Sequence, residues 1–134
     1  MSQLFQAINA SPAERSEITK EIVGYQLLVT SWDGESAATV VQTMRTWMQQ
    51  EAPGEAEKMT GKALGLFGQH QFEEAAGLAL QYQQSTGNDT ALIGFLEFGG
   101  AKNREAALAL TEKIHDAAAR ERVRKQIISG KQQL

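Results

Sequence analysis

Two histidines and several clustered glutamates are the residues whose chemistry could serve catalysis or metal binding. His70, Glu73 and Glu74 lie in the stretch HQFEE, where an i, i+3 spacing would place two ligands on one helix face. A di-iron bundle needs two such motifs with further glutamates on facing helices, and a zinc site needs a third ligand. We therefore interpret His70 as a solvated side chain in a link between two helices, and we predict no metal site.

Three glutamates near the N-terminus form a second candidate cluster. Glu14, Glu17 and Glu21 share one helix face and could bind a divalent cation. A metal-dependent all-α hydrolase would need a second acidic pair on a facing helix, and no matching Glu-x-x-Asp follows downstream. Acidic residues at a helix N-terminus are also explained by capping and by the helix dipole. The hydrolase is therefore the least favoured function.

Composition and spacing exclude several other chemistries. The sequence has no cysteine, which excludes thiol nucleophiles, disulfides and cysteine-ligated zinc. The stretch GGAK at 99–102 lacks the spacing and the Ser/Thr of a phosphate-binding loop, so we interpret it as a helix stop. His115 and Asp116 fit a helix end, where an imidazole suits the negative end of the dipole. We expect neither a catalytic residue nor a cofactor.

Charge is distributed unevenly along the chain. Residues 1–100 hold five Lys/Arg and twelve Asp/Glu, a balance of −7, whereas residues 101–134 hold eight and four, a balance of +4. The two balances sum to the net charge of −3. The basic excess includes the run Arg120, Arg122, Arg124 and Lys125.

This basic run could contact phosphates or an acidic partner, because Arg120 and Arg124 lie four residues apart on one helix face. A nucleic-acid binder usually has a broader basic stripe with aromatic residues for stacking, and no aromatic residue lies near this run. The competing interpretation is a solvated helix face with cations near its C-terminal end. Nucleic acid is therefore a less favoured partner than protein.

Tryptophan offers a different kind of candidate. Trp47 falls inside an apolar stripe and is expected in the core, whereas Trp32 lies in the link SWDGES. An exposed Trp32 would be an interface anchor. We favour the alternative in which Trp32 folds back over the first hairpin. Trp32 is still kept as a candidate partner-binding residue, together with Arg120, Arg124 and Lys125.

The elements that must position these residues are helices, because apolar residues recur at helical spacing nearly everywhere. The cleanest stripe is Val40, Val41, Met44, Trp47 and Met48, and a second is Ile18, Ile22, Tyr25 and Val29. Such stripes usually face the core.

Caps and breaks delimit these helices. A capping box at 11–14 (SPAE) starts one helix, Ser36 can cap another, and Asp116 can cap the last. The expected helices cover residues 3–9, 12–30, 36–50, 54–67, 71–84, 89–98, 103–115 and 117–129.

The helices form an internal repeat of about 32 to 40 residues, each unit a helical hairpin. A shift of 32 places Ala75 on Ala107 and Phe95 on Ile127, and a shift of 105 places Arg15 on Arg120. Alanine and glycine in the runs EEAAGLAL and REAALALTEK are expected where one helix closely approaches its neighbour.

The segments FEEAA at 72–76 and REAAL at 104–108 resemble the opening of the second helix in tetratricopeptide-type hairpins. The segment SPAERSEI, followed by an apolar helix, resembles hairpins of HEAT-like solenoids. The proline that follows the second helix in tetratricopeptide repeats is absent from this sequence, and the Trp-Leu-Gly pattern of their first helix has no match. The resemblance implies a curved α-solenoid used for protein binding, and no individual binding residue.

Length and composition are consistent with one soluble domain over residues 1–134. No segment approaches the roughly 18 apolar residues of a membrane span, and the N-terminus lacks a signal-peptide pattern, so we expect a cytoplasmic protein without a membrane partner.

The sequence thus predicts an all-α fold, a short α-solenoid of about four stacked antiparallel hairpins at residues 1–30, 36–68, 71–99 and 103–130. The expected function is a non-enzymatic interaction or scaffold module that binds a protein or peptide on its concave or edge surface. A small helical nucleic-acid or nucleoprotein binder using the basic C-terminal helix is the alternative. Apolar Leu4, Phe5 and Ile8 predict an uncapped N-terminal edge, which favours homo-oligomer contact or an upstream repeat.

Overall fold

The computed structural model describes residues 11–130, apart from the side chains of residues 101–102. Within that range the chain forms seven α-helices and one 3-10 helix, and no strand. Their bounds are α2 Pro12–Val29, α3 Ala37–Glu51, α4 Pro53–Gly68, α5 Phe72–Thr86, α6 Thr90–Gly99, η1 Gly100–Asn103, α7 Arg104–Thr111 and α8 Ala117–Ser129. The predicted all-α class is confirmed. The helix predicted over residues 3–9, with Leu4, Phe5 and Ile8, lies outside the described residues.

Two of the predicted caps are confirmed. The Glu14 amide donates to Ser11 Oγ and the Ser11 amide donates to Glu14 Oε1, each at 3.2 Å, which completes the capping box of α2. The Ala119 amide donates to Asp116 Oδ2 at 2.8 Å at the start of α8. Ser36 precedes α3 as predicted but makes no side-chain capping bond, because its backbone is helical rather than extended.

One helix is shorter than predicted. The helix expected over 103–115 ends at Thr111 as α7. The amides of Glu112 and Lys113 bond three residues back, to Ala109 and Leu110, instead of four. These tighter bonds mark the end of the α-helix and lead into the link before α8.

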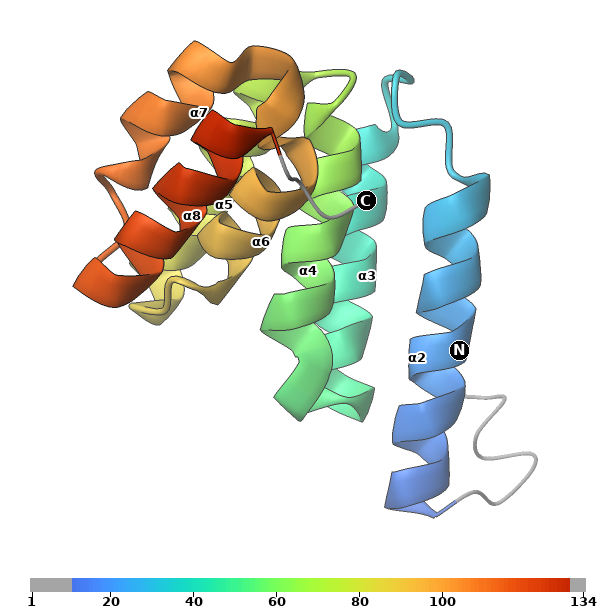
Figure 1. Cartoon of the computed structure of the whole chain (residues 1–134). Coiled ribbons are helices and arrows are strands. Elements are labelled where there is room, and N and C mark those ends of the chain that lie inside the picture. The colour runs from blue at the N-terminus through green and yellow to red at the C-terminus, as the bar shows by residue number, and fades with distance from the viewer. Residues whose placement is uncertain (1–10, 131–134) are drawn as a thin grey trace.

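The helices gather around one hydrophobic core, with α2 at one side of the molecule (Figure 1). α3 and α4 lie next to α2, and α5 to α8 lie beyond them. α6 packs against both α4 and α8. None of the described helices combines the length and the apolar character that a bilayer crossing requires.

The closest helix approach is between α4 and α6, and glycine makes it possible. A Cβ atom on Gly61 would lie 2.9 Å from the Cα of Gly94, and one on Gly99 would lie 2.7 Å from the carbonyl oxygen of Gly65. Because residue numbers rise together along this contact, α4 and α6 run in the same direction. The predicted close approach at Gly77, within EEAAGLAL, is wrong: Gly77 is exposed and a Cβ there would meet nothing within 4 Å.

The predicted stripe of α3 is largely buried, and Trp47 belongs to the core as expected. The predicted stripe of α2 faces the core only in part, because Ile18 and Ile22 are partly buried and pack against the core. The buried residues of α2 are Thr19, Val23 and Leu27, whereas Tyr25 and Val29 from the predicted stripe are exposed. Tyr25 and Val29 are exposed because α2 carries apolar residues on two faces and its described neighbours lie on one side of it.

Candidate functional site

The outward side of α2 carries three of the four exposed large apolar side chains among the described residues. Large apolar side chains on it are exposed, with Tyr25 at 59%, Leu28 at 86% and Val29 at 63%. Among the described residues, Ile128 is the one other large apolar side chain that is exposed. Three such residues within five positions form a patch, and patches of this kind mark interaction surfaces in soluble proteins.

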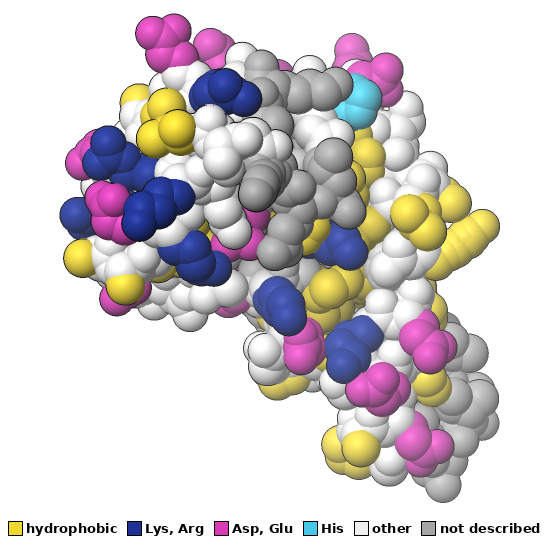
Figure 2. All heavy atoms as spheres, in the orientation of Figure 1, with side chains coloured by type: hydrophobic (Ala, Val, Ile, Leu, Met, Phe, Trp, Pro, Cys, Tyr) yellow, Lys and Arg dark blue, Asp and Glu magenta, His cyan; other side chains and the backbone are white. Residues whose placement is uncertain are grey.

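The patch continues toward the N-terminal half of α2 as an acidic surface. Ile22 is half-buried beside the patch, and Glu14, Glu17 and Glu21 are exposed. We call the seven residues Glu14, Glu17, Glu21, Ile22, Tyr25, Leu28 and Val29 the α2 outer face. Figure 2 shows acidic side chains over the lower part of the edge where α2 lies and hydrophobic side chains over its upper part.

Two shallow depressions follow this division. One of about 340 Å³ is lined by Ile22, Tyr25, Gln26 and Val29. The other, of about 330 Å³, is lined by Ala13, Glu14, Glu17 and Ile18. The α2 outer face therefore offers an apolar half and an acidic half along one helix.

Two of the three carboxylates of this face, Glu14 and Glu17, interact with neighbouring residues of α2 or its cap. Hydrogen bonds from the Ser11 hydroxyl and then from its amide lower the pKa of Glu14. Glu17 pairs with Lys20 at 3.0 Å, and this contact raises the pKa of Lys20. Within the part of the chain that the structure describes, no group of three His, Asp or Glu side chains could hold a metal ion.

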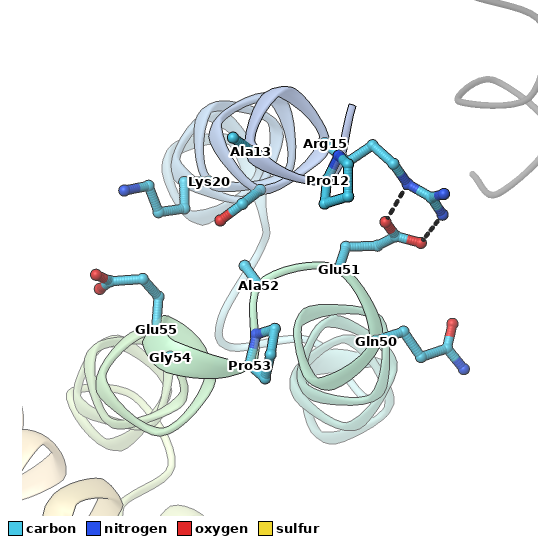
Figure 3. A pocket seen from close by; sticks show the side chains of 11 residues that line it. Pro12, Ala13, Arg15, Lys20, Gln50, Glu51, Ala52, Pro53, Gly54 and Glu55 are labelled. Carbon is cyan, nitrogen blue, oxygen red and sulfur yellow. Dashed lines mark hydrogen bonds and ion pairs between the residues drawn. The ribbon is translucent and has the colours of Figure 1, made fainter. Parts of the chain in front are cut away.

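A groove of about 680 Å³ lies on another side of α2, between its N-terminal half and the turn that joins α3 to α4 (Figure 3). Ala13, Ala52 and two prolines supply its apolar lining, with charged side chains on both flanks. The only hydroxyl among its described lining residues is Ser16, and no histidine lines it. The groove therefore lacks a nucleophilic side chain paired with a histidine as general base.

Two of the four charged side chains that line the groove, Arg15 and Glu51, are paired with each other. Arg15 donates from Nε to Glu51 Oε2 at 2.7 Å and from a terminal nitrogen to Oε1 at 2.6 Å, a two-bond contact seen in Figure 3. The Glu51 side chain is only 5% exposed, and the bond to it raises the pKa of Arg15. This ion pair ties the start of α2 to the end of α3, which is a structural role.

The predicted basic cluster of α8 is divided by the structure. Arg120 donates from two nitrogens to the carbonyl oxygen of Ile114, at 2.9 and 3.2 Å, and so closes the link before α8. Arg122 lies 3.2 Å from Glu97. Arg124 is 3.7 Å from Glu112 and 3.6 Å from Glu121, and Lys125 is exposed. Of the three predicted contact residues in this cluster, Lys125 is exposed, Arg124 is partly exposed beside two glutamates, and Arg120 is engaged in the fold.

Trp32 is in the core. It is 7% exposed, its indole N–H donates to the Leu27 carbonyl oxygen at 3.1 Å, and its ring lies 6.4 Å from that of Phe67. The favoured expectation, that Trp32 folds back, is confirmed. The alternative of an exposed anchor is wrong, because Trp32 has almost no surface left for a partner.

The two histidines lie apart. His70 is exposed in the link between α4 and α5, as predicted. The ring of His115 is exposed, with Nδ1 3.4 Å from Asp89 Oδ1. Asp89 also accepts the amides of His115 and Asp116, each at 3.0 Å, and a bond from Gln83 at 2.8 Å. Partial burial alone would raise the pKa of Asp89, but these hydrogen bonds outweigh it and the pKa is lowered.

Sequence reasoning missed two features. Leu28 belongs to none of the predicted stripes, although the run LLV at 27–29 is a signal of apolar side chains on more than one helix face. The buried Arg45 pairs with Glu57, and its guanidinium lies 4.2 Å from the ring centre of Tyr82. Burial raises the pKa of Tyr82. Arg45, Glu57 and Tyr82 connect three helices, and little of their surface is accessible to a partner.

Comparisons of the chain with protein-family models, with curated proteins and with solved structures found no match.

Proposed function

We propose that the chain is a non-enzymatic protein-interaction module, built as a short stack of helical hairpins, that binds protein through the α2 outer face. The observation that carries the proposal is the exposure of Tyr25, Leu28 and Val29 on a helix with a second, buried face. Burying a large apolar side chain contributes roughly 1.5 to 3 kcal/mol. A partner that covers these three residues therefore gains a hydrophobic driving force.

The hairpin stack is supported by the packing of alternate helices. α4 and α6 run parallel with their glycines in contact, and α6 packs in turn against α8. Residues that lie 32 positions apart also have similar burial. Ala75 and Ala107 are both fully buried, and so are Phe95 and Ile127. A solenoid presents the face of its terminal helix as an edge, and α2 has that position among the described helices.

Site-specific crosslinking tests the proposal. A photo-reactive phenylalanine analogue replaces Tyr25, and a matched one replaces Gln42, an exposed residue of α3. We expect discrete protein adducts in the native host from position 25 and few from position 42, identified by mass spectrometry. Leu28→Ser in the first variant should remove the adducts, because it deletes the most exposed apolar side chain of the patch.

Two controls make the outcome decisive. Gln49→Ser on the exposed side of α3 carries a similar change in helix propensity and should leave the adducts unchanged. Circular dichroism should show the same helix content in every variant. Adducts of equal yield at positions 25 and 42, or adducts that survive Leu28→Ser, would refute binding through the α2 outer face.

A further inference from the structure

We infer that α2 is an exchangeable helix, which leaves its seat on α3 and α4 and occupies the same seat on a second copy of this chain. Each copy gives one α2 and receives one, so two copies form a closed dimer. The occupant fits the seat by construction, because every contact that α2 makes with its own chain can be made with another. This exchange uses the buried face of α2, so it goes beyond the proposed function, which concerns the outer face.

Few interactions hold α2 on its seat. Of its 18 residues, Thr19, Val23 and Leu27 are buried. The Thr19 hydroxyl is buried without a hydrogen-bond partner among the described residues, which weakens the contact that buries it. The closest helix contact, between Gly61 and Gly94, does not involve α2. α2 can therefore separate while the rest of the described fold stays packed.

The seat on α3 and α4 is rich in methionine. Val23 is fully buried and lines a narrow crevice together with Met44, Met48 and Met59. Methionine side chains are flexible and adapt to the helix that packs on them. The seat is thus suited to a helix that leaves and is replaced.

A charged contact makes the seat selective for α2. Arg15 reaches Glu51 through two bonds of 2.6 and 2.7 Å, and the Glu51 side chain is only 5% exposed (Figure 3). A two-bond contact between a guanidinium and a nearly buried carboxylate has a specific geometry, and its loss leaves a buried charge. Arg15 of a second copy satisfies Glu51 as well as the chain's own Arg15 does.

The link between α2 and α3 indicates where the exchange begins. Gln71 donates to the carbonyl oxygens of Trp32 and Gly34, each at 3.0 Å, and Trp32 is buried. These contacts hold the link from Trp32 onward against the rest of the fold. Residues 30–31 lie between this held part and the end of α2 at Val29, so a change of backbone angles there redirects α2.

Charge reversal at the Arg15–Glu51 contact tests the inference. The variant Arg15→Glu places two carboxylates at this contact, and the variant Glu51→Arg places two guanidinium groups there. If α2 is exchanged, a mixture of the two restores both contacts, because the α2 of each variant then meets the opposite charge on the other. Mixing restores no contact within a single chain.

The two variants are unfolded in urea, mixed in equal amounts and refolded at about 1 mM, because concentration favours dimers. Native mass spectrometry then separates homodimers from heterodimers, since the two variants differ in mass. The matched control mixture is Glu97→Arg with Arg122→Glu, which reverses an ion pair between α6 and α8. A single chain with Arg15→Glu/Glu51→Arg is the second control.

We expect the wild-type chain to form dimers under these conditions, and the mixture to contain at least ten times more heterodimer than homodimer of either variant. The control mixture should show no such excess, and the double variant should dimerise as the wild type does. If a single variant fails to fold alone, recovery of its helix content in the mixture, followed by circular dichroism, is the equivalent supporting result.

Three results would overturn the inference. They are a wild-type chain that stays monomeric, a mixture without excess heterodimer, and single variants whose helix content does not recover on mixing. The crosslinking test at position 25 probes the outer face of α2 and does not depend on these results. The exchange can therefore fail while the proposed function stands, and the reverse.

Discussion

Glu51 is a carboxylate with almost no exposure, and Arg15 from a different helix supplies its counter-charge. Arg15→Ala would leave Glu51 buried without this partner. We expect the free energy of unfolding to fall by about 1 to 3 kcal/mol, below the cost at fully buried pairs because Arg15 is itself one-third exposed. Urea unfolding at pH 7 measures the change.

The matched variant for this prediction is the double change Arg15→Ala/Glu51→Gln. A neutral amide is less costly to bury than an unpaired carboxylate, so the double variant should be more stable than Arg15→Ala alone. If both variants unfold at the wild-type midpoint, the ion pair contributes nothing to stability.

Asp89 gives a prediction with a definite pH dependence. Its carboxylate accepts bonds from Gln83 and from the amides of His115 and Asp116, and its pKa is lowered in the folded state. A lowered pKa means that the stabilisation is present above the unfolded-state pKa of about 4 and is lost as pH falls through the folded-state value.

Asp89→Asn should therefore lower the free energy of unfolding at pH 7 by about 1 to 3 kcal/mol, because one of its accepting oxygens is replaced by a donor. The difference from wild type should shrink as the pH is lowered below about 4. Urea titrations at several pH values follow it. A difference that stays constant down to pH 2 would show that the charge of Asp89 is not the source.

At the scale of elements, the contact of α4 with α6 depends on glycine. Gly61→Ala would place a methyl group 2.9 Å from the Cα of Gly94, which is backbone and cannot move aside cheaply. We expect a loss of about 1 to 3 kcal/mol from overpacking, which exceeds the gain in helix propensity. Thermal or urea unfolding measures it.

Gly77→Ala is the matched control for Gly61→Ala. Gly77 also lies inside a helix, but a Cβ atom there meets nothing within 4 Å. Removing the conformational freedom of glycine should stabilise the chain by about 0.5 to 1 kcal/mol. If the two substitutions change stability in the same direction, close packing at Gly61 is not the cause.

The elements that sequence could predict are those determined by local chemistry. The helices 12–30 and 117–129 begin at Ser11 and Asp116 because those side chains satisfy amides a few residues away, and the structure confirms both. The face that α2 buries depends instead on where its neighbours lie, and two apolar faces were available. For the same reason the expectation of close approach in the run EEAAGLAL fails at Gly77, although Ala75 and Ala79 of that run are buried. The glycines in closest contact are Gly61 and Gly94.

The candidate site was only partly predictable, and the cause is again spatial. The candidates Trp32, Arg120, Arg124 and Lys125 follow from residue type and position. These predict that Trp32 folds back, which its burial confirms, but they do not reveal that Arg120 bonds to a backbone carbonyl. The α2 outer face becomes visible only once the buried side of α2 is known. Exposure, rather than composition, distinguishes it from the other helices.

The described helices differ in how firmly they are held in the molecule as a whole. α2 buries three of its 18 residues, whereas α4 buries eight of 16 and α6 five of ten. α2 also lies at the edge, and the contact of α4 with α6 does not involve it (Figure 1). Opening α2 alone would therefore expose little apolar surface and leave the interior packed.

Native-state hydrogen exchange should show this difference. We expect the amides of α2 to exchange through a local opening of lower free energy than the openings that expose α4 and α6, which should approach global unfolding. Mass spectrometry of peptides from 12–29, 53–68 and 90–99 gives the three values at low micromolar protein. Equal protection of all three would mean that α2 opens only when the whole chain unfolds.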